Sequence, residues 1–461
     1  MNSNRFFVRS AGLSLAVVLL GGFTPERAMA ASNMRSASGA ALAPGDVAPG
    51  RLYSRDATEG IGPGRVSVSN PASPKQPLAA PLAPETRRSK STVLHVAPRS
   101  AATQLELPID APDEAWVMII PKGNDAKAGE DALRDVALFD AKGVRADRRA
   151  TRDAQNQMGV DPARLKAEGI LKPIAMLRLN REMGRGKYKV QIGAKAAALG
   201  VAIEIRVPSS TIELSLTSSA MQLFPGDDGY VTVGLQSEAP VDHVRYEASL
   251  YNPRFERERT VPVVKVGNEY RAMVSRAMNE KDETGAWVLE VRAVGSAGGQ
   301  DFDRLGQTAF GFAVPTARIA SVGKERLVRE PGGKVTALEV DVVLDSQALD
   351  RYEVTGTLVA TDAKGVERPV AEAQVTDQFA AGTHTLTLRF EAGHAGLSKL
   401  DGSYALRGLQ LYSLGTNTLY HRLAKGLDLR FPAVRASELA AAEVTPAIES
   451  MVRAGEFDVG Q

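Results

Sequence analysis

The chain has 461 residues, 44% of them hydrophobic and 24% charged, which is too much sequence for one core and predicts several folded domains. It contains no cysteine, so disulfides, thiolate metal sites and cysteine nucleophiles are excluded. The formal net charge is +2. The basic excess lies in the first 100 residues, and the mildly acidic remainder argues against nucleic-acid binding, which needs a clustered positive face.

The N-terminus has the layout of a secretory signal peptide. Arg5 and Arg9 precede an apolar run over residues 11–23, and an Ala-x-Ala cleavage site follows at residues 28–30. We therefore expect a signal peptide over residues 1–30 and export through the inner membrane, to the periplasm or beyond. No later stretch reaches the length of a transmembrane helix, so none is expected after cleavage.

Residues 31–91 are rich in proline, alanine, serine and glycine, as in NPASPKQPLAAPLAPE. Such a composition buries too little apolar surface to offset the entropy of ordering. The sequence therefore predicts a disordered leader, with a spacer favoured over a recognition tail.

Beyond residue 92 short runs of alternating apolar and polar residues predict strands. One pattern of glycine, any residue, aromatic and alternating side chains occurs three times, with its aromatic at Tyr188, Trp287 and Tyr404. The spacing of about 100 residues suits one sandwich domain per copy. We predict an all-β protein of three tandem immunoglobulin-like β-sandwiches, over residues 92–210, 211–316 and 317–434. Both tryptophans, Trp116 and Trp287, are expected in the core.

The sequence DAKGV occurs at residues 140–144 and 362–366, where it predicts two hairpin turns and a relationship between the first and third domains. Two short helices interrupt the strands. One is a helical insertion over residues 161–169, which begin Asp-Pro and end in glycine. The other lies in a helical tail, residues 435–461, and runs from Thr445 to Gly455 with an apolar stripe.

Residues 400–412 (LDGSYALRGLQLY) and 285–295 (GAWVLEVRAVG) resemble the late strands of bacterial immunoglobulin-like domains. With the signal peptide and leader, the tandem arrangement is similar to an uncharacterised family of exported proteobacterial proteins. The resemblance covers residues 92–434. It brings no catalytic residues, and the Cys-Trp-Cys pattern of antibody domains is absent.

Motifs for catalysis are absent: there is no H-E-x-x-H, no G-x-S-x-G, no Walker A and no G-x-G-x-x-G. His384 and His394 lie ten residues apart across a predicted turn, so a two-histidine site is conceivable, although two ligands are few for a metal. We name no catalytic and no cofactor-binding residue.

Acidic loops of the second domain are candidates for calcium, which prefers six to eight oxygen ligands. The calcium loop motif D-x-[DN]-x-[DN]-G is not matched, and acidic turn residues need no ligand. The candidate metal-binding residues are Asp227, Asp228, Asp282, Glu283, Asp301 and Asp303.

The favoured function is a non-enzymatic exported binding or scaffold protein, whose partner is a protein or a glycan. The alternative is a secreted hydrolase with its active site at a junction between domains, near residues 208–211 or 315–318. A weaker alternative is a periplasmic assembly factor that adds a strand to a client. A pocket with convergent carboxylates at either junction would favour the hydrolase.

Overall fold

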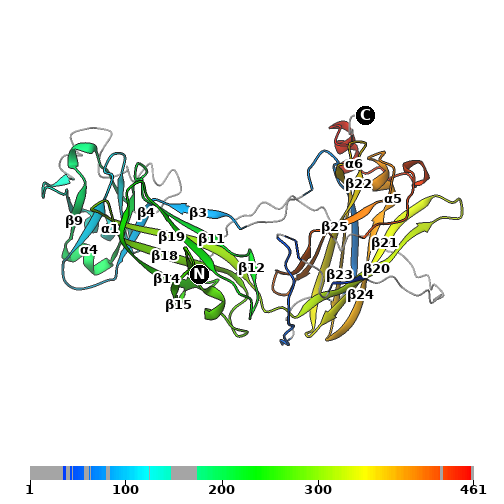
Figure 1. Cartoon of the computed structure of the whole chain (residues 1–461), viewed down its shortest axis with the longest axis horizontal. Helices are drawn as coiled ribbons and strands as arrows, with labels where there is room; N and C mark the ends of the chain where they lie inside the picture. The colour runs from blue at the N-terminus through cyan, green and yellow to red at the C-terminus, as the bar shows by residue number, and fades with distance from the viewer. Residues whose placement is uncertain are drawn as a thin grey trace. The chain divides into compact units, whose positions relative to one another are not determined.

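A computed structural model describes residues 35–37, 42–43, 45–56, 62, 64–78, 84–123, 125–146, 174–425 and 429–457. The predicted signal peptide and the predicted helical insertion at 161–169 lie outside these residues. Strands dominate the described chain, which confirms the all-β prediction (Figure 1). No helix within those ranges is long and apolar enough to cross a bilayer.

Buried apolar side chains form three clusters, and each cluster lies between two antiparallel sheets. The sheet pairs are called the first, second and third sandwich in chain order. Tyr188, Trp287 and Tyr404 each lie in a different cluster, at 1% exposure or less. The repeated motif therefore supplies a central side chain to three separate cores, as expected. The predicted limits of the domains stay a prediction.

The first sandwich pairs a four-stranded sheet with a three-stranded one. Helices α1 and α4 follow strand ends, and the sequence analysis predicted neither. In sheet order, the strands are β4 (Ser91–Val96), β10 (Val201–Arg206), β6 (Trp116–Pro121) and β8 (Ala175–Arg178), then β5 (Thr103–Ile109), β9 (Gly186–Ile192) and β7 (Val136–Phe139); the helices are α1 (Ala126–Arg134) and α4 (Ala194–Leu199).

The second sandwich has two five-stranded sheets, and all but one of their pairings are antiparallel. A 3-10 turn at Val274–Ala277 covers part of the core. The first sheet is β16 (Val263–Val266), β17 (Glu269–Ala272), β13 (Val231–Gln236), β11 (Glu213–Ser218) and β3 (Thr86–Ser89). The second is β12 (Gln222–Leu223), β19 (Gln300–Phe312), β18 (Gly285–Ala297), β14 (Val241–Tyr251) and β15 (Arg257–Val261).

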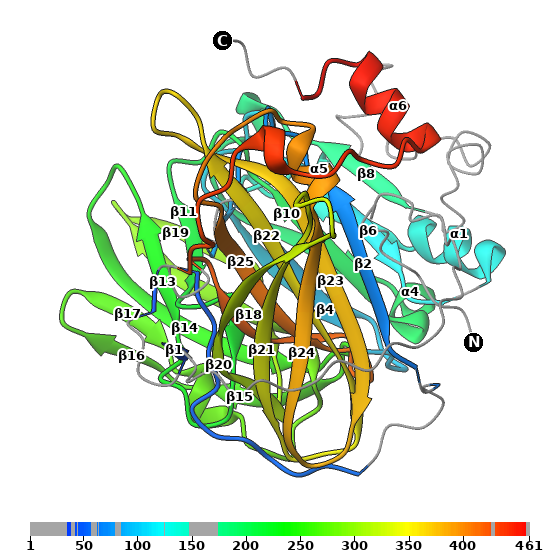
Figure 2. The same ribbon diagram turned by 90° about the vertical axis from the view of Figure 1, so that its right-hand side faces the viewer.

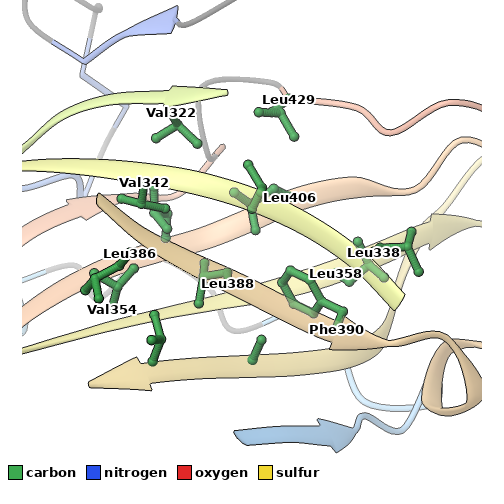
Figure 3. Close-up of a cluster of buried hydrophobic side chains, with 14 of the residues drawn as sticks. Val322, Leu338, Val342, Val354, Leu358, Leu386, Leu388, Phe390, Leu406 and Leu429 are labelled. Carbon is green, nitrogen blue, oxygen red and sulfur yellow. The ribbon is translucent and has the colours of Figure 1, made fainter. Parts of the chain in front are cut away.

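The third sandwich has the largest cluster of buried residues of the three, in which leucines, valines and Phe390 from the two sheets interdigitate (Figure 3). One sheet is β1 (Arg35–Ser36), β20 (Ala317–Arg329), β21 (Val335–Ser346) and β24 (Gly382–Glu391). The other is β2 (Val66–Pro71), β23 (Glu367–Phe379), β22 (Asp350–Thr361), β25 (Ala405–Ser413) and β26 (Thr418–Leu423). Helix α5 (Ala392–Gly396) lies between β24 and β25, and a 3-10 turn (Ala436–Glu438) and α6 (Pro446–Arg453) follow β26.

The predicted tail helix is present as α6. The Thr445 hydroxyl accepts a hydrogen bond from the Ile448 N–H, and proline occupies the first turn. The predicted apolar stripe is only partly buried, because Ile448 is 4% exposed whereas Val452 is 53% exposed.

The described part of the leader differs from the predicted disorder. Residues 35–36, 66–71 and 86–89 form β1, β2 and β3, which add to the edges of β20, β23 and β11. Figure 2 shows β2 beside β23. Composition failed here because an edge strand is held by main-chain hydrogen bonds, which need no apolar side chains.

Trp116 is another departure. The alternation along β6 buries Val117 and Ile119 and turns Trp116 to the outer face, where the Arg178 guanidinium lies 5.6 Å from its ring. Only Trp287, at 1% exposure, is a core tryptophan.

Candidate functional site

Each of the three aromatic anchors donates a hydrogen bond of the same kind to a backbone carbonyl. The Tyr188 hydroxyl donates to the Gly184 carbonyl (2.8 Å), the Trp287 Nε1 to the Glu283 carbonyl (2.6 Å) and the Tyr404 hydroxyl to the Leu400 carbonyl (2.9 Å). Each acceptor lies four residues upstream. Burial raises the pKa of Tyr404 to about 12. These phenols and the indole are therefore structural anchors, as in the tyrosine corner of sandwich proteins.

Five of the six predicted calcium ligands have another role. Asp227 accepts a hydrogen bond from the Phe224 N–H at 2.8 Å, and burial raises its pKa. Asp282 forms an ion pair with Arg259 at 2.8 Å. Its neighbour Glu283 lies 3.4 Å from Arg254.

Of the other predicted ligands, Asp301 lies 3.3 Å from Lys187, Asp303 is bound by Arg292, and Asp228 is exposed. Within the described ranges no group of three or more histidine or acidic residues is placed to hold a metal ion. The calcium site thus stays a prediction with no cluster behind it.

The hypothesis of a two-histidine site at His384 and His394 is wrong, because no turn brings the two residues together. His384 lies near the start of β24 and His394 lies in α5, just after the strand ends. A strand rises about 3.3 Å per residue, so the backbone from His384 to the end of β24 at Glu391 spans about 23 Å, which separates the two histidines.

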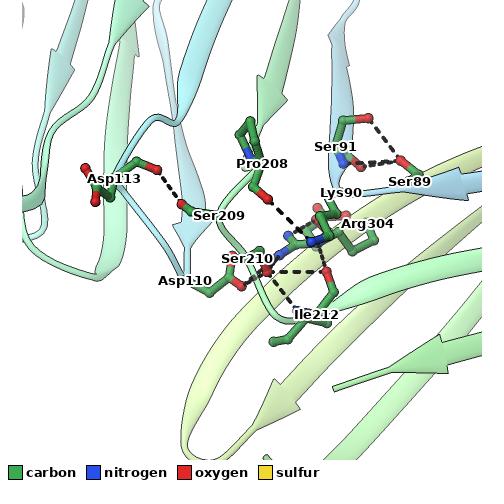
Figure 4. Close-up of polar contacts among 11 residues, drawn as sticks. Ser89, Lys90, Ser91, Asp110, Asp113, Pro208, Ser209, Ser210, Ile212 and Arg304 are labelled. Atoms are coloured by element: carbon green, nitrogen blue, oxygen red, sulfur yellow. Dashed lines mark hydrogen bonds and ion pairs between the residues drawn. The ribbon is translucent and has the colours of Figure 1, made fainter. Parts of the chain in front are cut away.

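The junction near residues 208–211 holds a buried charged network rather than a pocket (Figure 4). The Arg304 Nη2 of β19 donates to both carboxylate oxygens of Asp110, at 2.7 and 2.8 Å, and to the Ser210 hydroxyl at 2.6 Å. Arg304 Nε donates to the Ile212 carbonyl at 3.0 Å. Arg304 is 1% exposed, Ser210 2% and Asp110 7%. The network joins the first two sandwiches through groups that water barely reaches.

A second ion pair extends this junction. Asp303, also on β19, accepts from Arg292 Nε at 3.0 Å and from the Thr92 hydroxyl of β4 at 3.0 Å. The hydrogen bond to Asp303 raises the pKa of Arg292. Asp303 therefore contacts both sandwiches and fixes the Arg292 side chain on the outer face of β18.

An open groove of about 480 Å³ lies beside this ion pair. Its lining comes from β4 and β5 of the first sandwich and from β14, β15, β18 and β19 of the second. The pairing register of β14 and β18 places Ser249 opposite Glu290 and Glu247 opposite Arg292. The polar lining residues are His95, Glu106, Glu247, Ser249, Tyr251, Arg257, Glu290 and Arg292.

Hydrogen bonds hold the groove side chains in place. The Tyr251 hydroxyl donates to Glu290 Oε1 at 3.2 Å, and Gln307 Nε2 donates to Glu290 Oε2 at 2.8 Å. Burial and the Glu290 carboxylate raise the pKa of Tyr251, so this phenol stays protonated at neutral pH. The groove thus presents preorganised carboxylates, a guanidinium and an aromatic ring, a set that recognises polar ligands.

The junction near residues 315–318 has a smaller cavity of about 440 Å³. The only carboxylate among its lining residues is Asp345, which pairs with Arg318 at 3.2 Å and accepts from the Thr383 hydroxyl at 3.1 Å. A larger cavity of about 760 Å³ lies beside α5 and α6, where alanines, Leu397, Leu439 and Phe457 dominate its lining. Neither brings carboxylates together as the groove does.

Sequence reasoning missed Arg304, Asp110 and Ser210. The one signal was in β19, where Phe302, Asp303 and Arg304 interrupt the alternation, and all three are buried. A charged pair in a strand gives no indication of its partner, since Asp110 is 194 residues away.

The fold defines a class: an all-β protein of β-sandwich domains. Residues 317–430 match the family model described as the C-terminal domain of a domain of unknown function, DUF4785. A solved structure of a DUF4785 family protein from Legionella pneumophila is similar, with a TM-score of 0.62 and 18% identity over 85% of this chain and 99% of that one. These matches confirm the resemblance to an uncharacterised proteobacterial family.

Part of the Salmonella alpha-2-macroglobulin structure also matches, with a TM-score of 0.20 and 11% identity over 73% of this chain and 23% of that one. No curated protein matches the chain.

Proposed function

We propose that this chain is a non-enzymatic exported binding or scaffold protein, and that it recognises its partner in the groove between the first two sandwiches. The observation that supports this is that an open polar groove lies beside a buried ion pair that contacts both sandwiches. Asp303 holds Arg292 in the groove and Thr92 on the neighbouring sandwich. A binding surface on rigid strands loses little conformational entropy when its ligand arrives.

The groove fits a polar partner, a glycan or a polypeptide. Carboxylates such as Glu290 accept hydrogen bonds from hydroxyl or amide donors, and the half-buried Tyr251 offers a ring for stacking. The apolar residues Leu94, Leu105 and Leu305 contribute contact area.

One observation favours a secreted hydrolase as the second candidate. Glu106, Glu247 and Glu290 line the same groove as His95. Hydrolysis of a glycoside needs two carboxyl groups on opposite sides of the bond that is cut, and this groove supplies three.

One experiment separates the two candidates. The purified chain is screened by thermal shift against soluble envelope oligosaccharides and peptide pools, and each ligand found is incubated with the protein overnight and analysed by mass spectrometry. Binding with an intact ligand supports the binding protein, and cleavage supports the hydrolase. The variants Tyr251→Ala and Glu290→Gln should weaken binding at least tenfold. Tyr230→Ala, which removes a ring outside the groove, should not; equal binding by all variants would move the site elsewhere.

Export has its own test. Expression of the full chain with a C-terminal tag, followed by cell fractionation, should recover a protein whose N-terminus is Ala31. A tagged protein that retains Met1 and stays in the cytoplasm would contradict export while leaving the groove proposal open to the binding screen.

A further inference from the structure

The third sandwich uses a strand from the far end of the chain at one edge. Strand β2 pairs with β23 over six residues, from Val66 opposite Thr376 to Pro71 opposite Ala371. The following residue continues the ladder, because the Ala72 N–H donates to the Val370 carbonyl at 3.2 Å. We propose that the β23 edge is a strand-acceptor surface for an extended polypeptide segment of a partner protein, and that β2 occupies it within the same chain.

Strand β2 contributes almost nothing to the core. On its inner side Ser67, Ser69 and Pro71 lie opposite Val375, Ala373 and Ala371 of β23, which are buried. The valines Val66 and Val68 are on the outer side, and Val66 is 45% exposed. No β2 side chain is fully buried. Apart from the Ser69 hydroxyl, its attachment therefore depends on main-chain hydrogen bonds, which any extended segment can form.

Another leader strand shows the contrast. Strand β3 is held on β11 by side chains: Arg88 pairs with Glu213 at 2.6 Å and reaches Gln236 at 3.3 Å, and the Thr86 and Thr217 hydroxyls are 2.8 Å apart. An exchanged segment would have to reproduce these contacts at β11. At β23 the only side-chain contacts of the strand that an exchanged segment would have to reproduce are those of Ser69, so β23 is the edge suited to exchange.

One position of β2 does make side-chain contacts and defines what a partner strand should carry. The Ser69 hydroxyl accepts from the Glu391 N–H at 3.1 Å and lies 3.1 Å from His394 Nδ1. Burial lowers the pKa of His394, which keeps the ring neutral and able to accept the serine proton at neutral pH. The preferred partner is therefore an extended segment with a serine or threonine opposite Ala373.

The absence of cysteine allows a clean trapping experiment. Val68 lies opposite Gln374, so the double variant V68C/Q374C should form a disulfide within one chain under mild oxidation. A covalent dimer in its place would assign the edge to β2 of a second copy and would overturn the assignment to a separate partner.

The test itself uses the full-length Gln374→Cys chain with a synthetic peptide that copies residues 64–73 and has cysteine in place of Val68. Because the Ala72 N–H faces β23, those of Asn70 and Val68 face it too, whereas that of Ser67 faces away. Val68→Pro in the chain should therefore release β2 and raise peptide adduct at least tenfold, and the matched control Ser67→Pro should not. Equal adduct in both would overturn the proposal.

A second arm needs no change in β2. With the unaltered leader and Gln374→Cys, the cysteine peptide should still form adduct slowly, and the same peptide with proline at the position of Asn70 should form at least tenfold less. Equal adduct from both peptides would show reaction without strand addition and would refute the acceptor edge, whether or not the Val68→Pro chain folds.

Discussion

At the scale of single residues, the repeated motif has one physical explanation. The glycines that precede the aromatics, Gly186, Gly285 and Gly402, have φ angles of +138°, +145° and +142°. This region is open to glycine and costs other residues about 1–3 kcal/mol. The glycine adopts a positive φ angle at or just before the start of the strand. The aromatic side chain two residues later packs in the core and donates a hydrogen bond to the carbonyl four residues before it.

Gly402 allows that cost to be measured alone. Among the residues that the structure describes, no atom outside its chain neighbours lies within 4 Å of the position of an added Cβ, so alanine brings strain without a clash. Gly402→Ala should lower the free energy of unfolding of the third sandwich by about 1–3 kcal/mol in chemical denaturation. The control Gly332→Ala, with no left-handed φ and its nearest atom at 3.8 Å, should change it by less than about 0.5 kcal/mol. Equal losses would contradict the strain explanation.

His421 predicts a dependence of stability on pH. Its Nδ1 accepts from the Ile319 N–H at 3.0 Å, its Nε2 meets no partner among the described residues, and burial together with Arg318 lowers its pKa to about 4. The unfolded chain, with a histidine pKa near 6.5, binds the proton more readily. Stability should therefore fall as pH falls from about 6.5 to about 4, by about 3 kcal/mol, and this contribution is constant below.

The measurement compares urea unfolding of the wild type and His421→Asn at several pH values. The asparagine keeps an acceptor for the Ile319 N–H but does not titrate, so the difference between the two proteins should shrink by about 3 kcal/mol between pH 7 and pH 4. His384→Asn, at the edge of the sheet, provides the matched control. A difference that does not vary with pH would refute the buried neutral histidine.

At the scale of elements, the two DAKGV turns are the same structure. In each, the aspartate carboxylate accepts from the backbone N–H groups two and four residues later, at 2.8–2.9 Å. The glycines Gly143 and Gly365 have φ angles of +78° and +79°. Five residues thus define a complete turn, which is why this element was predictable from sequence.

The contribution of the turn to stability can be tested at Asp140, which is 1% exposed, so that water cannot easily replace its hydrogen bonds. Asp140→Ala should lower the free energy of unfolding by about 1–3 kcal/mol, because two N–H groups lose their acceptor. Asp140→Asn keeps an oxygen for both and should lose less than half of that. The check is equilibrium unfolding by intrinsic fluorescence. An equal loss in both variants would point to the negative charge rather than the two hydrogen bonds.

Sequence patterns predicted the elements whose determinants are adjacent residues and failed for those that depend on distant partners. The tail helix has its signals, Thr445 and Pro446, in adjacent residues. Trp116 was misassigned because a short apolar run does not reveal which alternate residues face inward. The leader strands were missed because edge pairing depends on the partner β23, β11 or β20 and leaves little trace in the sequence of the strand that is added.

At the scale of the whole molecule, the Arg304 network should couple the first two sandwiches. Arg304→Ala leaves Asp110 buried without its ion pair, which typically costs about 3–5 kcal/mol. Calorimetry should show the unfolding of these sandwiches move to lower temperature and separate into two transitions. Arg326→Ala removes a guanidinium that is 43% exposed and pairs with Glu339 and Asp341, and it should lower the free energy of unfolding by about 1 kcal/mol or less. A single unshifted transition for Arg304→Ala would show that the network does not join the sandwiches.

The candidate site could be predicted only in outline. The junction near residues 208–211 was predicted, but the groove residues come from six strands of two sandwiches, and groove carboxylates such as Glu106 and Glu290 are far apart in sequence. Convergence of this kind depends on sheet register and on packing between domains. Single-sequence periodicity describes neither.

The edge pairing of β2 also bears on the order of synthesis. Ser69 and the Glu391 N–H that it binds are 322 residues apart, so a ribosome completes most of the chain before the first segment can reach its final neighbour. Until then the β23 edge has no strand beside it, and the β2 segment has no strand to pair with. Closure of this edge is therefore a late step of folding.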